Sequence, residues 1–320
     1  MEPDDIEHQN KSREQIAQDI HSATYGLSSD PMLAFAVVFS ALIHDVDHLG
    51  LTNPELCELD TPTSRAYRGK SVAEQNSVDI AWSVLTNNDD FEDLRACIYT
   101  SESEMRRFRQ LVVNAVMATD IADKDLKKIR ESRWGAAFSS EPTVSPGQNT
   151  GLDTDRKATI VFEYIIQASD IAHTMQHWYT YQKFNKRLFE ERYVAYIQGH
   201  CEKDPSVGWY KGELWFFDNY IIPLANKLHT CGVFGVSYYE FLAYARQNRR
   251  EWETKGQDIV TEMLKSCQEK YPNDGHGSSV RRLEVAQLTL PLVVNGKESY
   301  GTVTQSQQTE NTNEDSRVEI

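Results

Sequence analysis

The residues best suited to chemistry stand in "FSALIHDVDHLG" (residues 39–50), where an apolar run ends in two histidines and two aspartates within five positions. Imidazole and carboxylate together form a ligand set that Zn²⁺, Mg²⁺ and Mn²⁺ accept. Adjacent residues on a helix point about 100° apart, so His44 and Asp45 can reach one ion only if it lies against that helix in a pocket. The pair predicts a metal site at the end of a helix.

Two later stretches repeat the pattern. "LVVNAVMATDIAD" and "IVFEYIIQASDIAH" each carry an apolar helix into an aspartate, Asp120 and Asp170. A carboxylate among such apolar residues loses its hydration, so it must be paired, hydrogen-bonded or bound to a cation. A lone aspartate at a helix end is more often a cap or an ion-pair partner. Together with His44 and Asp45, however, Asp170 favours a metal ion between the helices.

Asp47 and His48 are weaker candidates. They either hold the metal ligands in place through hydrogen bonds or form an ion pair with each other. We favour the first interpretation for both residues.

The elements that must position these residues are helices. From about residue 29 to 271 the pattern is helical, and strand-like alternation is scarce. "SSDPMLAFAVVFSALIHD" opens with capping residues and Pro31, and "SESEMRRFRQLVVNAVMATD" has Ser101 and Glu104 at capping-box spacing. Without internal repeats, this run predicts one compact all-α, multi-helix domain over residues 29–271.

Three segments lie outside the predicted core. Residues 139–155 ("SSEPTVSPGQNTGLDTD") are rich in Ser, Pro and Gly and indicate a loop. Residues 272–320 are polar apart from "LTLPLVV" and are predicted to be a mostly disordered tail. Residues 1–28 are interpreted as a connector.

The composition and charge of the chain exclude several classes of protein. The chain has 320 residues, 40% of them hydrophobic and 25% charged, as in a soluble globular protein. Its net charge of −15 argues against a nucleic-acid partner, which needs a basic surface. No stretch reaches the roughly 18 apolar residues of a membrane span, and the N-terminus is unlike a signal peptide. The expected localisation is cytoplasmic.

Five motifs, in order, resemble those of class I 3',5'-cyclic-nucleotide phosphodiesterase catalytic domains, members of the HD superfamily. They are "HDVDHLGLTNPEL", "YRGKSVAEQNSV", "AVMATDIAD", "ASDIAH" and "GELWFFDNYIIPLANKL". The resemblance covers about residues 30–252. Any one motif is a weak match, but five in order are specific.

The resemblance implies a compact all-helical domain with two divalent ions, usually Zn²⁺ and Mg²⁺ or Mn²⁺, that share a bridging hydroxide. His44, Asp45 and Asp170 match ligands of the zinc-type ion, and Asp45 also matches the bridge to the second ion. Such ions lower the pKa of the bridging water and clamp the cyclic phosphate for in-line attack. The implied product is a nucleoside 5'-monophosphate, and the implied role is in signal transduction.

Further residues acquire roles only through the resemblance. Positions around the second ion, its waters and the supporting hydrogen bonds are matched by Asp47, His48, Asn53, Glu74 and Asp120. His173 is grouped with them, although many members have asparagine there, and Asn76 and Ser77 stand where many have histidines. Phe216 and Leu188 match the hydrophobic clamp of the purine, although Phe216 could also be one more core aromatic.

Glu213 stands where the family has an invariant glutamine. An ionised carboxylate offers only acceptors, which suits the N1–H and 2-amino donors of guanine and opposes the N1 acceptor of adenine. Glu213 therefore predicts a preference for cyclic GMP over cyclic AMP. A protonated Glu213 would regain a donor and lose this discrimination.

One family motif is missing from the sequence. Members carry a His-Asn-x-x-His segment upstream of the His-Asp pair, which supplies the general acid and a fourth zinc ligand. Only His8 and His21 precede His44, and neither begins such a segment. We therefore identify no catalytic general acid and interpret the chain as N-terminally truncated, with residues 1–28 resembling the connector of algal and protist members. Losing a general acid costs about 10²–10⁴-fold in rate, so this chain alone is expected to be nearly inactive.

Two alternatives stay open. The chain could be a non-catalytic cyclic-nucleotide-binding or dimerising pseudoenzyme module, or an HD-type nucleotidase, against which the purine clamp around Phe216 argues. A homodimer is compatible with the sequence. Membrane association would come only from segments absent from this chain, on the cytosolic side of a membrane in a longer parent protein.

Overall fold

The computed structural model describes residues 11–138, 150–234 and 238–272, and within these ranges it contains helices and no strand. The all-α fold predicted from the sequence is confirmed. Within the same ranges, no helix combines the length and apolarity needed to cross a membrane.

The helices follow one another with short connections. The first group is α2 (Arg13–Ala23), α3 (Pro31–Ile43), α4 (Asn53–Glu58), α5 (Pro62–Ala66), α6 (Val72–Asn87), α7 (Glu92–Ile98), α8 (Glu102–Thr119) and α9 (Lys124–Phe138). The second group is α10 (Thr150–Asp170), α11 (Trp178–Ile197), α12 (Trp209–Phe216), α13 (Ile222–Cys231) and α14 (Tyr238–Lys270). Single turns of other helix types are η1 (Leu27–Ser29), η2 (Asp89–Phe91), η3 (Ala172–Met175), η4 (Pro205–Val207) and η5 (Phe217–Ile221).

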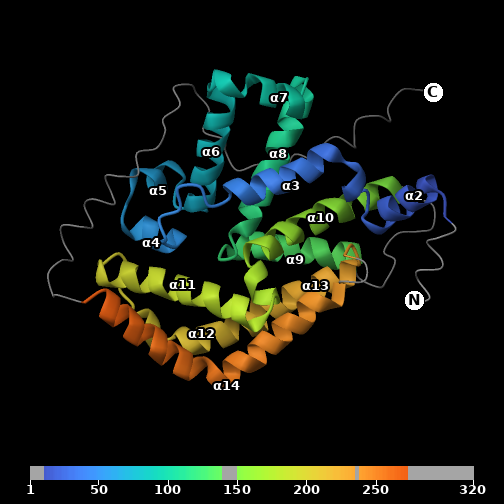
Figure 1. Cartoon of the computed structure of the whole chain (residues 1–320). Coiled ribbons are helices and arrows are strands. Elements are labelled where there is room, and N and C mark those ends of the chain that lie inside the picture. The colour runs from blue at the N-terminus through green and yellow to red at the C-terminus, as the bar shows by residue number, and fades with distance from the viewer. Residues whose placement is uncertain (1–10, 139–149, 235–237, 273–320) are drawn as a thin grey trace, which may run out of the picture.

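Helix α10 joins two layers of helices (Figure 1). It packs against α8 and α3 on one side and against α13 on the other. The upper layer in Figure 1 contains α3, α6, α7 and α8, and the lower layer contains α11 to α14. Because α3 and α10 both end near the middle of the molecule, side chains at their C-terminal ends can meet between the layers.

Each layer has its own aromatic core. In the upper layer Phe108 is fully buried, and its ring lies 5.6–6.3 Å from four other ring centroids, those of Phe35, Phe39, Trp82 and Tyr99. In the lower layer Tyr181 and Trp252 are fully buried and pack edge to face at 5.8 Å. Both cores support the helix ends that carry the candidate site.

The predicted helix starts are present. Asp30 accepts a hydrogen bond from the Leu33 amide and Pro31 fills the first turn of α3. Ser101 and Glu104 form the predicted capping box at the start of α8. Each bond satisfies an amide that would otherwise lack a partner at a helix N-terminus.

Helix α10 begins earlier than predicted. Residues 150–155 are helical, whereas the sequence indicated a loop up to residue 155. The Ser/Pro/Gly pattern marks the connection but cannot fix the first helical residue. The rest of that loop, residues 139–149, lies outside the described residues, as do residues 273–320 of the predicted tail. Helix α2 lies within the predicted connector.

A π-helical turn interrupts the continuous helix formed by α12, η5 and α13. The Ile222 amide donates to the Phe217 carbonyl, which is a five-residue spacing. Pro223 follows directly, and a proline has no amide hydrogen for the carbonyl four residues earlier and clashes with it. The wider turn accommodates Pro223 without ending the helix.

Candidate metal centre and nucleotide pocket

His44, Asp45 and Asp170 come together at the ends of α3 and α10. His44 Nε2 lies 3.3 Å from Asp170 Oδ1 and 3.3 Å from Asp45 Oδ2. One ligand atom from each of the three residues lies within 4.8 Å of the others. Residues separated by more than a hundred positions in the sequence thus form one cluster of atoms that could ligate a metal ion, called the metal-ligating cluster below.

Hydrogen bonding orients the His44 ring for ligation. His44 Nδ1 is 2.9 Å from the Ala41 carbonyl, which can only accept, so Nδ1 carries the hydrogen. In the neutral ring Nε2 then presents a lone pair to the two carboxylates. A backbone carbonyl behind a metal-binding histidine is the usual arrangement.

Electrostatics show how strongly this cluster attracts a cation. Hydrogen bonds from His44 to Asp170 and Asp45 raise the pKa of His44 to about 10, and the histidine in turn lowers the pKa of Asp45. Two carboxylates therefore face His44 Nε2 and favour a positive charge there.

Two distances in the cluster are compatible with a tetrahedral divalent ion. Metal–ligand bonds of 2.0–2.1 Å place neighbouring ligands of a tetrahedral site about 3.3 Å apart, which matches the distances from His44 Nε2 to Asp45 and to Asp170. Three protein ligands and one open position for water are typical of catalytic zinc sites.

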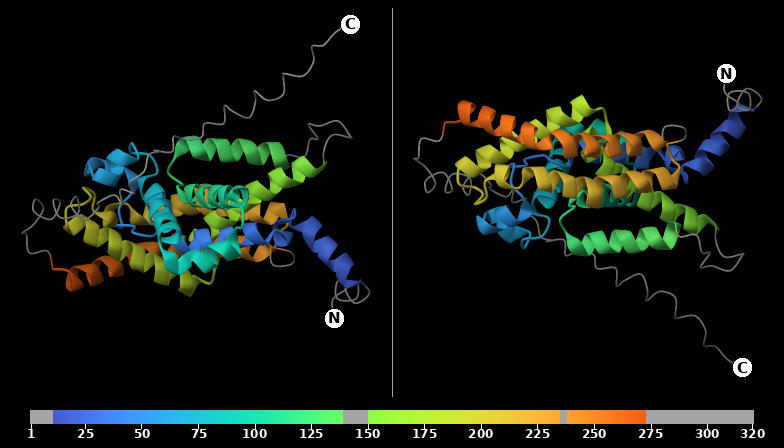
Figure 2. Two further views of the ribbon diagram at one scale, coloured as in Figure 1. Left: turned by 90° about the horizontal axis from the view of Figure 1, so that it is seen from above. Right: turned by 90° about the horizontal axis from the view of Figure 1, so that it is seen from below.

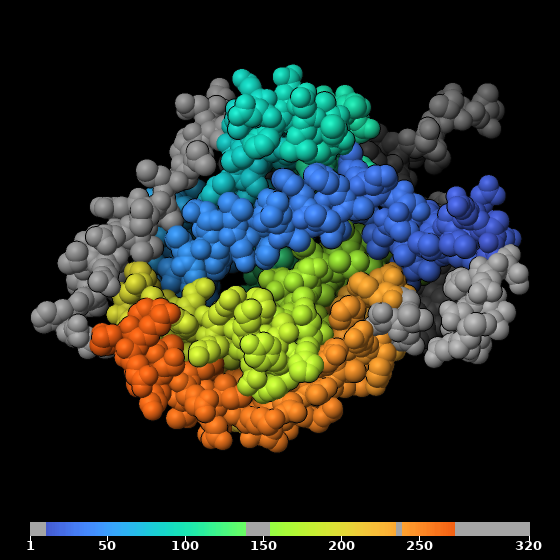
Figure 3. Space-filling model, in the orientation of Figure 1, coloured from blue at the N-terminus to red at the C-terminus, as the bar shows by residue number. Residues whose placement is uncertain are grey.

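The predicted burial of the three aspartates is wrong for two of them. The side chains of Asp45 and Asp170 are 63% and 31% exposed, whereas Asp120 is 5% exposed. Asp45 lies beyond the last turn of α3 and Asp170 ends α10, so each carboxylate has left the apolar face of its helix. Figure 3 shows the surface hollowed between α3 and the yellow-green residues that continue from α10 towards α11.

Asp120 is satisfied by protein donors. Its carboxylate accepts hydrogen bonds from Ser71 (2.7 Å), from Asn53 (3.3 Å) and from the amides of Ala122 and Asp123 (3.1 Å each). Four donors compensate a buried carboxylate without any cation. The charge of Asp120 therefore does not require a metal ion.

Glu74 lies next to Asp120. Asn53 donates to Glu74 at 3.0 Å and bridges the two carboxylates. Burial, together with the charge of Asp120, raises the pKa of Glu74, whereas His48 lowers it. His48 also lowers the pKa of Asp45, so it links this cluster electrostatically to the metal-ligating cluster.

The loop after α3 is held by side chains of α6. Asn76 donates to Asp47 at 3.1 Å, and Ser77 donates to the Val46 carbonyl at 2.8 Å. Asp47 has a positive φ of 62°, a conformation that aspartate tolerates better than most residues. The amide and hydroxyl thus fix the loop.

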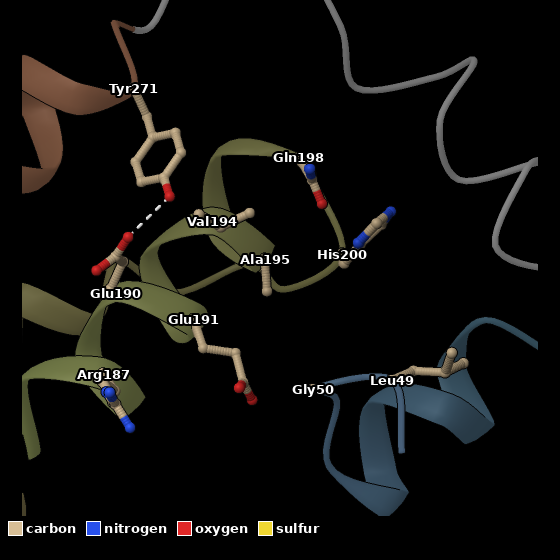
Figure 4. A pocket seen from close by; sticks show the side chains of 10 residues that line it. All are labelled: Leu49, Gly50, Arg187, Glu190, Glu191, Val194, Ala195, Gln198, His200 and Tyr271. Carbon is tan, nitrogen blue, oxygen red and sulfur yellow. Dashed lines mark hydrogen bonds between the residues drawn. The ribbon is translucent and has the colours of Figure 1, made fainter. Parts of the chain in front are cut away.

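Arg192 of α11 fastens the same loop from the other side. It donates to the Gly50 carbonyl at 3.1 Å and pairs with Glu55. Gly50 has φ +71°, and a Cβ there would lie 2.9 Å from Glu191 Oε1. A pocket of about 410 Å³ lies behind this contact, lined by Gly50, Glu191 and other residues of α11 (Figure 4). His44, Asp45 and Asp170 do not line it.

Glu213 belongs to a polar network between α11 and α12. The hydroxyl of the fully buried Tyr181 donates to Glu213 Oε2 at 2.7 Å. Asn185 lies beside both and accepts from the Trp209 indole at 3.2 Å. Burial raises the pKa of Glu213 to about 7, although the hydrogen bonds from Tyr181 and Asn185 oppose the shift.

Phe216 and Leu188 are the other two predicted nucleotide contacts, and His173 was predicted near the metal ions. Phe216 is half-buried and stacks on Tyr220, with centroids 5.3 Å apart and rings 10° from parallel. Leu188 on α11 is 46% exposed. His173 is half-buried one turn after Asp170 and stacks on Phe184 at 5.1 Å, and burial lowers its pKa.

Sequence reasoning missed Tyr181 and Asn185. Both lie in an aromatic-rich helix, and their spacing of four residues places them on one face. The sequence could have indicated them, because a tyrosine and an asparagine share a helix face with core residues. Polar groups buried on such a face need hydrogen-bond partners.

The Glu213→Gln variant is expected to become more stable relative to wild type as the pH rises from 5 to 8. The raised pKa means that folded wild type binds the Glu213 proton more tightly than the unfolded chain does. The stability that wild type gains from this proton is therefore complete below the ordinary pKa of 4.5 and is lost as the pH rises to about 7. The difference in unfolding free energy between variant and wild type should grow by about 2–3 kcal/mol from pH 5 to pH 8. Denaturant unfolding of both proteins measures it, and a pH-independent difference would contradict the prediction.

Comparisons with known proteins identify a family and several relatives of this chain. A family model described as 3'5'-cyclic nucleotide phosphodiesterase matches residues 17–231. A Caenorhabditis elegans protein named a probable 3',5'-cyclic-AMP phosphodiesterase is 27% identical over 202 residues, which are 59% of this chain and 27% of that protein. A Homo sapiens protein named dual specificity calcium/calmodulin-dependent 3',5'-cyclic nucleotide phosphodiesterase 1C is 25% identical over 180 residues, 55% of this chain and 23% of that protein. The chain spans about a quarter of the length of these relatives.

A solved structure has the same fold. The phosphodiesterase domain of Salpingoeca rosetta rhodopsin phosphodiesterase superposes with a TM-score of 0.57 at 19% identity, covering 77% of this chain and 75% of that domain. At this identity the likeness concerns the arrangement of helices alone.

Proposed function

The chain belongs to the 3',5'-cyclic nucleotide phosphodiesterase family, and we propose that it hydrolyses 3',5'-cyclic nucleotides to nucleoside 5'-monophosphates with divalent metal. The observation that carries the proposal is the placement of His44 Nε2 at 3.3 Å from both Asp45 and Asp170. Two carboxylates and an oriented imidazole at the edge of a hollow can hold a metal ion where a cyclic phosphate can reach it.

In the proposed site each group of residues has its own role. His44, Asp45 and Asp170 would hold an ion of the zinc type, which would supply an activated water and polarise the phosphate. Asp45, the most exposed of the three, would also be a ligand of a second ion, Mg²⁺ or Mn²⁺. Hydrolysis adds water to phosphorus and breaks the P–O3' bond, and the O3' oxygen takes up a proton. We assign none of the described residues as that proton donor, so slow turnover by this chain stays a prediction.

Asn53, Glu74 and Asp120 would support the second ion and its waters through their hydrogen-bonded cluster. Because Ser71, Asn53 and two backbone amides fix Asp120, its role in the proposal is to hold Asn53 and Glu74 rather than to bind metal. Asp47 and His48 shape the loop between the two clusters.

The purine is proposed to lie between Phe216 and Leu188, with Glu213 at its edge. Tyr181 and Asn185 already donate hydrogen bonds to Glu213, but a carboxylate has about four lone-pair sites, so a further site can accept from the N1–H or the 2-amino group of guanine. Adenine presents an acceptor at N1 and meets the ionised carboxylate unfavourably. Cyclic GMP is therefore the proposed preferred substrate.

The preference for cyclic GMP is expected to rise with pH. Because the pKa of Glu213 is about 7, the carboxyl is mostly protonated at pH 6 and mostly ionised at pH 8. A charge-assisted hydrogen bond contributes about 1.5–3 kcal/mol, so the kcat/KM ratio of cyclic GMP to cyclic AMP should reach roughly tenfold at pH 8. The Glu213→Gln variant should have a lower ratio that does not change between these pH values. Equal ratios in both proteins at pH 8 would show that Glu213 does not read the base.

The activity itself is tested by measuring hydrolysis of both cyclic nucleotides with Mg²⁺, Mn²⁺ or Zn²⁺, before and after chelation. The matched variants are Asp45→Asn and, on the exposed first turn of α7, Asp93→Asn. Metal-dependent release of 5'-monophosphate that only Asp45→Asn abolishes supports the proposal. Nucleotide binding without release would favour the non-catalytic module, and release of free phosphate from nucleoside monophosphates would favour the nucleotidase.

A further inference from the structure

Arg192 joins α11 to the segment that leads into α4, and α4 lies near the C-terminal end of α11 (Figures 1 and 2). Its guanidinium donates to Glu55 Oε2 at 2.9 Å and to the Gly50 carbonyl at 3.1 Å, and a second nitrogen donates to Glu55 Oε1. The side chains of Arg192 and Glu55 are 21% and 15% exposed. Burial opposes ionisation of Glu55, but hydrogen bonds from Arg192 and Thr52 lower its pKa, so the pair is ionised at neutral pH. A planar fork that holds a carboxylate and a carbonyl together fixes direction as well as distance.

The Glu55 end of this contact leads to Asn53. Glu55 Oε2 also accepts from the Thr52 amide at 2.8 Å and from the Thr52 hydroxyl at 2.9 Å, within the capping box at the start of α4. Asn53 is the first residue of that helix, and its amide bridges Glu74 and Asp120. The position of this bridge therefore depends on the carboxylate that the arginine of α11 holds.

The Gly50 end of the contact leads to His48. The Gly50 amide donates to His48 Nδ1 at 3.1 Å, while the Gly50 carbonyl accepts from Arg192. In the neutral His48 ring, Nε2 then carries the hydrogen. His48 interacts electrostatically with Asp45 and with Glu74. The residue that orients the His48 ring is thus the one that the arginine holds.

Apolar packing beside the pair is not directional. Leu51 and Leu56 are buried together with Ala195 of α11. Hydrophobic contact stabilises this packing without fixing its register, whereas the hydrogen bonds of Arg192 do fix it. Leu188, a proposed contact of the purine, precedes Arg192 by four residues and therefore lies on the same side of α11. One face of α11 thus carries both a proposed base contact and the bonds that hold the loop.

We propose that Arg192 is a positioning residue for the second divalent ion of the proposed phosphodiesterase site. Through Glu55 it places Asn53. Through Gly50 it places His48. The inference rests on the proposed function, because only that function requires a second ion beside the hydrogen-bonded cluster of Asn53.

The test titrates Mn²⁺ calorimetrically into the full chain that already holds one equivalent of Zn²⁺, so that Mn²⁺ reports the second ion. Arg192→Met removes the donors and keeps the apolar stem of the side chain. It is expected to weaken Mn²⁺ binding by about 10–100-fold, the range for losing a residue that supports metal ligands. The Zn²⁺ affinity of the metal-ligating cluster should stay within a few-fold of wild type. Arg192→Lys keeps a charged donor and should recover part of the loss.

A double variant separates position from stability. Arg192→Met leaves the charge of Glu55 without its partner, which lowers the melting temperature. Arg192→Met combined with Glu55→Gln has no unpaired charge, and the glutamine oxygen can still cap Thr52. Its melting temperature should recover towards wild type, whereas its Mn²⁺ affinity should not, because the Gly50 carbonyl still lacks its donor.

Arg65→Met is the matched control. Arg65 of α5 donates to the Asp60 carboxylate at 2.7 Å and to the Asp60 carbonyl at 2.8 Å, which are the same two kinds of contact in an exposed place. Its replacement should leave the Mn²⁺ affinity unchanged.

Two results would overturn the inference and leave the proposed function intact. One is equal Mn²⁺ affinity in wild type and Arg192→Met, and the other is recovery of Mn²⁺ affinity together with melting temperature in the double variant. A wild type that binds no second ion would overturn the inference together with the second ion of the proposed function.

Discussion

Replacing Asp170 by alanine is expected to weaken Zn²⁺ or Mn²⁺ binding by at least about 100-fold, the upper figure for loss of a residue that only supports a ligand. The variant removes one of the two carboxylates that face His44 Nε2 at 3.3 Å. Wild type should melt several degrees higher with metal than with chelator, since an ion at 100 times its Kd contributes about 2.7 kcal/mol. Calorimetric titration and melting curves measure both quantities.

Asp120→Asn is the control for the Asp170→Ala variant. Four protein donors already surround Asp120, so its replacement should lower stability and leave the metal affinity within a few-fold of wild type. An Asp170→Ala protein that retains wild-type affinity, or a wild type indifferent to chelation, would show that the metal-ligating cluster is misassigned.

Replacing Phe108 by alanine is expected to destabilise the fold by about 3–5 kcal/mol, the range for truncating a fully buried aromatic. Phe108 of α8 packs against Phe35 and Phe39 of α3, so the cavity would loosen the helix that ends at His44. Denaturant unfolding monitored by tryptophan fluorescence gives the free energy.

Leu94→Ala is the matched control for the Phe108 variant, because Leu94 is 42% exposed and should lose less than about 0.5 kcal/mol. A loss below about 1 kcal/mol for Phe108→Ala would mean that the upper aromatic core does not position α3.

Local patterns in the sequence predicted the helices and named the three residues that the structure brings together as candidate metal ligands. Capping residues and apolar periodicity are short-range signals, and they located the starts of α3 and α8 well. The partners of the acidic residues depend on long-range packing. Ser71 and Asn53 reach Asp120 from 49 and 67 positions away, and nothing in the local sequence indicates that neutral donors rather than a cation satisfy it.

The same limit applies to exposure and to pKa values. An apolar run before an aspartate predicts burial, but Asp45 and Asp170 lie just past the point where the helix face ends, which depends on one residue of register. For Glu213, the sequence named the acceptor but not Tyr181, whose hydroxyl occupies one oxygen and limits how the other can be used.

The π-helical turn at Phe217–Ile221 makes the length of this segment matter more than its composition. A deletion of one residue there would turn the wide turn into a regular one and bring back the clash between Pro223 and the carbonyl four residues before it, whereas an insertion would rotate α13 by about 100° relative to α12. Either Glu213 and Phe216 would leave the site or Leu224 and Leu228, both buried, would leave the core. Substitutions at exposed positions of the turn, such as Asn219, should be tolerated. Insertions and deletions between Phe216 and Pro223 should be selected against.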